Sequence, residues 1–171
     1  GIPSVLLWAT STHPDGIFIA VLEEVTADGA SRFITDGAIR ASHAKVSREE
    51  GWDSLGLPYH RGLEADAVRL DPEEPLELAF NLEATSYVLG AGSRLRLSLA
   101  CGMKGTYQQP DGFPDEMPLV GIRAGGAHAS FLRIPAILPD ASKFEGSLSI
   151  RAGDSRAGDS RAGEGRAGVS F

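Results

Sequence analysis

The sequence has only one cysteine, Cys101, among its 171 residues. A single cysteine excludes an internal disulfide, so packing and hydrogen bonds must hold the fold together. A chain of this length can bury a core large enough to fold without a disulfide or a structural metal. No pattern of basic residues around Cys101 indicates a reactive thiolate, and we therefore interpret it as a small apolar residue at the end of a buried strand.

Long apolar runs and clusters of basic residues are also missing. No segment approaches the roughly 18 consecutive apolar residues of a membrane span, and no charged and then apolar leader begins the chain. We therefore expect no membrane partner, and a cytoplasmic location is favoured. The formal net charge is -7, and no stripe of lysine and arginine offers the phosphate contacts that dominate nucleic-acid binding. We expect no nucleic-acid partner either.

Motifs of common active sites are absent as well. No Gly-x-Ser-x-Gly sequence could raise a nucleophilic serine on a strand-to-helix turn. The histidines do not have the His-x-His or His-Glu-x-x-His spacing of zinc sites, and the acidic loops at 71–74 and 111–116 lack the ordered ligand spacing of a calcium site. The sequence therefore predicts no catalytic residues, no metal site and no cofactor. We expect each of the four histidines to make a structural hydrogen bond: His13, His43, His60 and His128.

What the sequence does contain is apolar alternation, which is strict over residues 76–82 and 95–99. A period of two marks half-buried strands of an antiparallel sheet. The segment 17–25 is apolar on both faces over its first six residues, which predicts a central strand covered on both sides. Seven or eight short strands separated by turns predict an all-β sandwich. We expect the strands at residues 2–9, 17–25, 31–41, 75–82, 94–101, 119–123 and 130–138, with an eighth at 147–150.

The two ends of the chain differ from this body. The chain begins inside an expected strand, which is typical of a domain truncated at its N-terminus. Near the C-terminus the sequence Arg-Ala-Gly-Asp-Ser recurs with a period of five and has too few apolar residues to offset the entropy of ordering. We therefore divide the chain into a sandwich at 1–146 and a low-complexity tail at 147–171, whose repeats at 151–171 we expect to be disordered.

The connection formed by residues 42–66 is much longer than the usual connection of two to six residues, and loops of this length are commonly functional. It contains four candidate interface residues: Trp52, Leu57, Tyr59 and His60. Three interpretations remain open. The loop can cap the core of the sandwich, it can contact a partner domain or subunit, where tryptophan and tyrosine supply most of the binding energy, or it can stack on a sugar.

Several segments together resemble a known family. They are residues 20–43, the sequence Leu-Gly-Leu-Pro-Tyr-His-Arg at 55–61, and residues 75–78, 84–88 and 92–98. In this order they resemble the C-terminal domain of the X-Pro dipeptidyl-peptidase and cocaine esterase hydrolases, the CocE/NonD family. The resemblance covers about residues 1 to 138. One departure is Ser93, where the family commonly has histidine.

The resemblance implies a jelly-roll β-sandwich of the galactose-binding-like type, with long loops, attached to an α/β-hydrolase domain that carries the catalytic serine, aspartate and histidine. None of these three residues can be placed on this chain. The resemblance thus implies a non-catalytic accessory domain of a dipeptidyl-peptidase or of an acyl or ester hydrolase. Its expected partner is the catalytic domain, with assembly into a homo-oligomer as a further expectation. The alternative is an independent carbohydrate-binding module, in which Trp8, Trp52 or Tyr59 stacks on a sugar.

Overall fold

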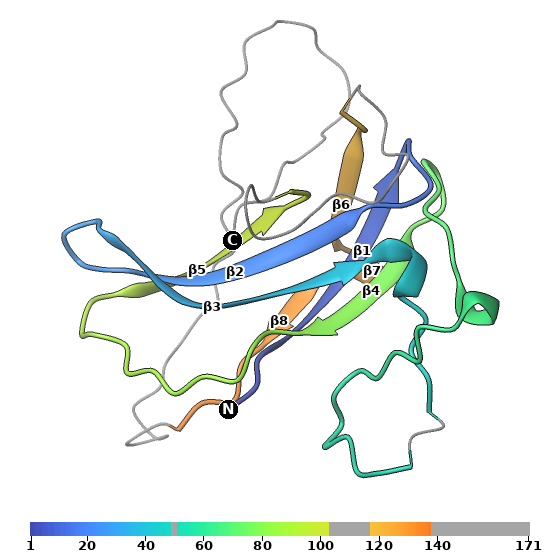
Figure 1. The fold of residues 1–171 in the computed structure, drawn as a ribbon. Helices are drawn as coiled ribbons and strands as arrows, with labels where there is room; N and C mark the ends of the chain where they lie inside the picture. The colour runs from blue at the N-terminus through green and yellow to red at the C-terminus, as the bar shows by residue number, and fades with distance from the viewer. Residues whose placement is uncertain (49–50, 103–116, 138–171) are drawn as a thin grey trace, which may run out of the picture.

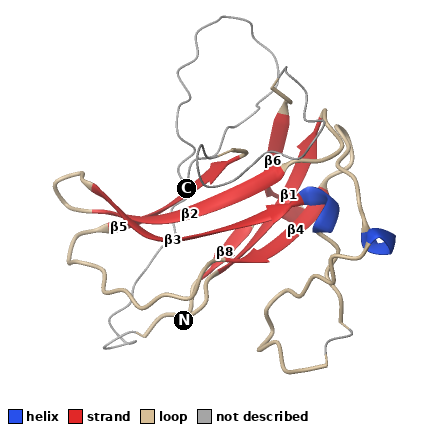
Figure 2. Cartoon of the chain, in the orientation of Figure 1, coloured by secondary structure: helices blue, strands red, loops and turns tan. Residues whose placement is uncertain are grey.

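The computed structural model describes residues 1–48, 51–102 and 117–137. Within these residues the chain forms eight strands and two short 3₁₀ helices (Figures 1 and 2), so the prediction of an all-β fold is confirmed. The strands are β1 (Ser4–Ser11), β2 (Ile17–Val25), β3 (Ser31–Arg40), β4 (Leu76–Asn81), β5 (Arg94–Ala100), β6 (Val120–Gly125), β7 (His128–Ala129) and β8 (Phe131–Arg133), and the helices are η1 (Ala41–His43) and η2 (Glu64–Asp66). Neither of these helices is long and apolar enough to cross a membrane. The strand expected at 147–150 and the tail at 147–171 lie outside the described residues.

The described strands form two sheets in which all pairs are antiparallel. In sheet A, β4 pairs with one side of β1, while β8 and β6 pair with the first and second halves of its other side, and β7 follows β6. In sheet B the order is β3-β2-β5. Sheet B lies in front of sheet A in Figure 1. The central position predicted for the strand at 17–25 is therefore confirmed.

Alternate residues of the strands fill the space between the two sheets. Leu7 of β1 and Leu78 of β4 are almost fully buried, as are Ala20 and Leu22 of β2. Their side chains belong to one cluster that draws on both sheets. Because the period of a strand is two, the intervening residues of sheet A face outward. The long loop lies against part of this outer face.

Strand β3 approaches the end of β4 so closely that only glycine fits at position 37. A Cβ atom at Gly37 would lie 2.3 Å from the carbonyl oxygen of Asn81. Beside this contact, Thr35 Oγ1 donates a hydrogen bond to the carbonyl oxygen of Glu83 at 2.8 Å, and the Glu83 amide donates to the carbonyl oxygen of Asp36 at 2.8 Å. These contacts join the two sheets along one side of the sandwich.

Candidate interaction surface

The long loop, residues 42–66, leaves the sandwich after β3 and projects at the lower right of Figure 1. Its neck is closed by a hydrogen bond of 2.8 Å from the amide of Ser47 to the carbonyl oxygen of Tyr59. A second backbone hydrogen bond joins its beginning to the segment that follows it, from the amide of Val68 to the carbonyl oxygen of Ser42 at 3.1 Å. The loop is therefore attached to the body at defined points.

A buried carboxylate, that of Asp66, fixes the base of the long loop. Arg61 donates from Nε to Oδ2 and from Nη2 to Oδ1, each at 2.7 Å, so its guanidinium binds the carboxylate through two hydrogen bonds. Lys45 Nζ lies 2.7 Å from Oδ1. The hydrogen bonds from Arg61 and then from Lys45 hold the pKa of Asp66 well below its usual range. Because Lys45 is near the start of the loop and Arg61 near its end, Asp66 ties the two together.

The imidazole of His60 makes a second attachment. His60 Nε2 lies 2.8 Å from the carbonyl oxygen of Ala79 in β4, and Nδ1 lies 3.3 Å from the carbonyl oxygen of Lys45. The structural hydrogen bond expected for this histidine is therefore present. Its candidate role in binding a partner stays a prediction, and both ring nitrogens face groups of the same chain.

The tip of the loop presents aromatic and aliphatic side chains. The rings of Trp52 and Tyr59 pack edge to face, with centroids 4.8 Å apart and an interplanar angle of 73°. Trp52 is nevertheless 60% exposed, and Leu55 is 77% exposed. Edge-to-face packing restricts the indole without covering it. The tip thus carries an exposed indole that packs against one neighbouring ring, on an anchored loop.

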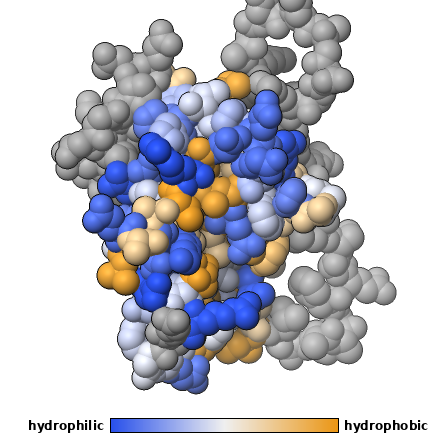
Figure 3. All heavy atoms as spheres, turned by 90° about the vertical axis from the view of Figure 1, so that its right-hand side faces the viewer, coloured by the Kyte–Doolittle hydropathy of each residue, from blue (hydrophilic) through white to orange (hydrophobic). Residues whose placement is uncertain are grey.

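Leu57 lines a hollow between the long loop and the outer face of sheet A. The hollow has a volume of about 490 Å³. Its apolar lining includes Val46 and Leu57 from the loop and Leu6, Ala79 and Phe131 from the sheet. Figure 3 views the side of the molecule from which the loop projects, and hydrophobic residues gather there between hydrophilic ones. The structure therefore separates the four predicted interface residues: Leu57 lines the hollow, Trp52 and Tyr59 contact each other, and His60 binds β4.

Trp8, the remaining aromatic residue proposed to stack on a sugar, lies on the outer face of β1 in sheet A. The ring of His128 lies beside it, with centroids 4.5 Å apart and an interplanar angle of 52°. The backbone amide of Trp8 donates a hydrogen bond to Ser130 Oγ at 2.9 Å. The side chain of His128 thus already contacts this indole. Carbohydrate stacking on Trp8 stays a prediction.

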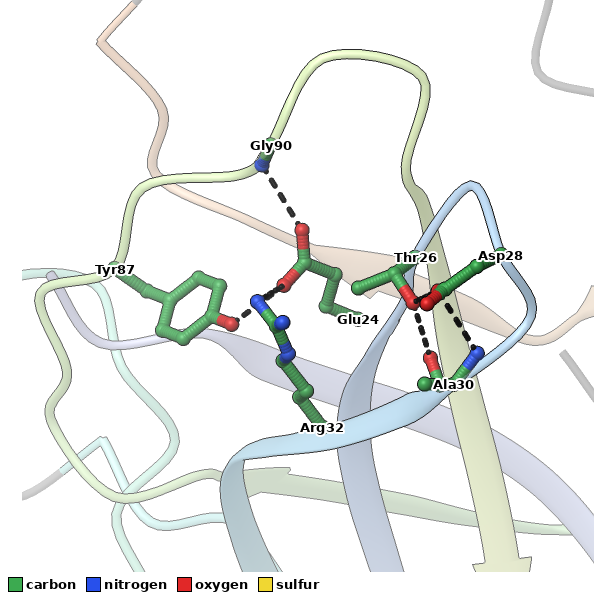
Figure 4. Close-up of polar contacts among 7 residues, drawn as sticks. All are labelled: Glu24, Thr26, Asp28, Ala30, Arg32, Tyr87 and Gly90. Atoms are coloured by element: carbon green, nitrogen blue, oxygen red, sulfur yellow. Dashed lines mark hydrogen bonds and ion pairs between the residues drawn. The ribbon is translucent and has the colours of Figure 1, made fainter.

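A second buried carboxylate, Glu24, was not singled out by sequence reasoning (Figure 4). Tyr87 donates its hydroxyl to Oε2 at 2.6 Å and the Gly90 amide donates to Oε1 at 2.9 Å, while Arg32 Nη1 lies 3.8 Å from Oε2. Hydrogen bonds from Ser93, Tyr87 and Gly90 lower the pKa of Glu24 to about 2. The same bond to Glu24 raises the pKa of Tyr87. The carboxylate therefore fastens the connection between β4 and β5 to sheet B.

Alternation along β2 is the signal that could have located Glu24. Phe18, Ala20 and Leu22 are buried, so a period of two places Glu24 on the same inner face. A carboxylate at a buried position must be paired or hydrogen-bonded, which predicts donors nearby. The sequence alone did not indicate which residues supply them.

Potential metal ligands and the thiol of Cys101 are the remaining groups that could carry chemistry in the described residues. No group of three or more histidine, cysteine, aspartate or glutamate side chains in residues 1–48, 51–102 and 117–137 could hold a metal ion. Cys101 follows β5 and packs against the core, and burial raises the pKa of its thiol. The expected absence of a cofactor and of catalytic residues stays a prediction.

Comparison with known proteins identifies the family. Residues 1–114 match the model of the X-Pro dipeptidyl-peptidase C-terminal non-catalytic domain. The chain belongs to this family. It is also 33% identical over 135 residues, or 79% of its length, to "Putative serine esterase Mb1866c" of Mycobacterium bovis and to "Putative serine esterase MT1883" of Mycobacterium tuberculosis. The chain covers 21% of each of these relatives, so it spans about a fifth of their length. No solved structure matches the chain significantly.

Membership of this family confirms the resemblance that the sequence segments indicated. The description of the family calls this domain non-catalytic, as the resemblance implied. The alternation of the strands and the family motifs both predicted a β-sandwich. The attachments of the loop and the hollow depend on contacts between residues distant in the sequence, so they could be seen only in the structure.

Proposed function

We propose that this domain is the C-terminal accessory part of an α/β-hydrolase and packs on the catalytic domain of that enzyme through the long loop. The enzyme's reaction is the hydrolysis of an ester, an acyl bond or an X-Pro peptide bond, and the names of the mycobacterial relatives favour the ester. In this proposal the sandwich acts mechanically, because it supports the catalytic domain and forms part of the wall around its site.

The observation that carries this proposal is an exposed Trp52 on a firmly anchored loop. Trp52 and Leu55 together expose apolar surface at the tip of this loop, and tryptophan is enriched among the residues that dominate the binding energy of protein interfaces. The ion pairs of Asp66 and the hydrogen bond from His60 to Ala79 hold the base of the loop. An anchored loop loses less conformational entropy on binding than a free one, which strengthens the contact.

Two finer features belong to the same proposal. We infer that the sandwich is a jelly roll of the galactose-binding-like type, which its two antiparallel sheets support, and that residues 1–146 form the domain while 147–171 form a tail. Assembly into a homo-oligomer is the second arrangement in which the same loop could be buried.

Photo-crosslinking in the full-length polypeptide of the reading frame that contains this chain tests the docking. Trp52 is replaced by p-benzoylphenylalanine, and the crosslinked peptides are identified by mass spectrometry after irradiation. The matched control carries the same group in place of Phe33, an exposed aromatic residue of sheet B. We expect position 52 to crosslink to the catalytic domain and position 33 to do so much less.

Two results would contradict the proposal. Equal crosslinking from both positions would show that Trp52 has no special partner, and crosslinks only between copies of the chain would favour the oligomer. Binding of the 171-residue chain to a glycan, lost on Trp52→Ala, would instead favour the carbohydrate-binding alternative.

A further inference from the structure

The hollow beside the long loop combines an apolar floor with two arginines, Arg48 and Arg133. We propose that it receives a segment of the catalytic domain that presents an apolar side chain next to an aspartate or glutamate. This inference rests on the proposed function, because it names the contact by which the two domains would recognise each other.

The floor of the hollow is suited to an apolar side chain. Leu6 of β1 is opposite Ala79 of β4 on one side and opposite Phe131 of β8 on the other, so the three residues form a row across sheet A. Phe131 is 45% exposed and Val46, on the facing loop, is 41% exposed. A volume of about 490 Å³ is in the range of pockets that bind small ligands. Covering these side chains would remove apolar surface from water, which is favourable.

The charges of the hollow are suited to a carboxylate. Neither Arg48 nor Arg133 has a carboxylate partner within residues 1–48, 51–102 and 117–137. Glu77 is the single acidic residue among the described lining residues, so the lining is positive although the chain as a whole has a net charge of -7. An acidic group of a partner would therefore be attracted to this lining.

Arg133 lies where it can contact both the apolar side chain and the carboxylate of such a segment. Its guanidinium carbon lies 6.0 Å from the centroid of the Phe131 ring. Contact with a ring face restrains the guanidinium while its N–H groups remain able to bind a carboxylate through two parallel hydrogen bonds. An apolar side chain on Phe131 and a neighbouring carboxylate on Arg133 would then be bound together.

Crosslinking from inside the hollow tests the inference in the same full-length polypeptide. Leu57, which lines the hollow, is replaced by p-benzoylphenylalanine. We expect the crosslinked peptide to come from the catalytic domain and to contain an aspartate or glutamate next to an apolar residue. Arg133→Glu should lower the crosslinking yield about tenfold, because repulsion replaces a charged hydrogen bond. Arg94→Glu, an equal change of charge on β5, should leave the yield unchanged.

Two further variants separate charge from folding and geometry. Arg133→Lys keeps the charge but cannot bind a carboxylate bidentately, so it should give an intermediate yield and an unchanged melting temperature. Changing the identified carboxylate to arginine should restore crosslinking in the Arg133→Glu variant.

The outcomes distinguish this inference from the proposed function. Crosslinks to the catalytic domain from position 52 but not from position 57 would overturn the inference and leave the docking intact. The inference is likewise wrong if Arg133→Glu behaves like Arg94→Glu, or if position 57 crosslinks only to a second copy. If neither position 52 nor position 57 reaches the catalytic domain, both proposals are wrong.

Discussion

His60 Nε2 lies 2.8 Å from the carbonyl oxygen of Ala79, so a side chain of the long loop donates a hydrogen bond to strand β4. Because a carbonyl oxygen only accepts, this hydrogen bond forms when the imidazole carries a hydrogen on Nε2. The loop is attached by this imidazole at one point and by the ion pairs of Asp66 at another. It follows that the base of the loop is part of the scaffold.

His60→Ala should loosen the loop without unfolding the sandwich. The variant loses the hydrogen bond to Ala79, while the core between the sheets is untouched. We expect faster hydrogen exchange of the backbone amides at 51–59 and unchanged exchange in β1 and β2, measured by mass spectrometry. His43→Ala, at an exposed histidine of η1, is the control and should leave exchange at 51–59 as it is. Equal effects of the two variants would contradict the anchoring role.

Asp66→Asn should lower the melting temperature by several degrees at pH 7. The amide cannot balance the charges of Lys45 and Arg61, which then lie close together without a carboxylate between them. Thermal unfolding followed by circular dichroism measures the shift. Glu64→Gln, in the same short helix η2 and exposed, is the matched control and should have little effect. An unchanged melting temperature in Asp66→Asn would show that these ion pairs do not hold the loop.

The carboxylate of Glu24 should make the fold sensitive to acid. The pKa of Glu24 is lowered from its ordinary value of 4.5 to about 2 in the folded chain, so the unfolded state binds a proton first. The stabilisation is therefore complete above pH 4.5 and is lost as the pH falls towards 2. Melting temperatures measured from pH 7 to pH 2 should fall less steeply for Glu24→Gln than for the wild type.

The control for this experiment is Glu73→Gln, at an exposed glutamate. It should reproduce the pH dependence of the wild type. If Glu24→Gln did the same, the hydrogen bonds from Tyr87 and Gly90 would contribute nothing to stability in solution.

Leu7→Ala should destabilise the sandwich by about 2–5 kcal/mol, because a cavity replaces a core side chain that is only 1% exposed. Leu55→Ala, on the tip of the loop, should change the free energy of unfolding by less than about 0.5 kcal/mol. Urea unfolding at pH 7 measures both. Similar losses from the two leucines would mean that Leu7 does not lie in the core.

Strands β4 and β5 could be predicted because their apolar residues alternate with polar ones. Apolar alternation predicted strands at 75–82 and 94–101, and the structure has β4 at Leu76–Asn81 and β5 at Arg94–Ala100. The strand expected at 130–138 is shorter, since β8 covers Phe131–Arg133 and a separate short strand, β7, precedes it. Between them lies Ser130, which binds the carbonyl oxygen of Arg123 through both its amide and its hydroxyl, and no periodicity signals this interruption.

The contacts of the site were harder to predict, because they join residues distant in sequence. Trp52 and Tyr59 could be recognised by residue type, yet nothing in the pattern indicated that their rings touch. The pairing of Lys45 with Asp66 spans 21 residues, and that of Glu24 with Gly90 spans 66. Such pairs depend on how the strands meet, which a periodicity along one segment does not specify.

The neck of the long loop, closed between the amide of Ser47 and the carbonyl oxygen of Tyr59, has an evolutionary consequence. If the tip docks as proposed, insertions and deletions between these two residues would change the docking surface while this hydrogen bond keeps the neck of the loop closed. Related enzymes could therefore diverge in the way their domains fit together while they keep the same sandwich, and a designer could exchange this short stretch between them as a unit.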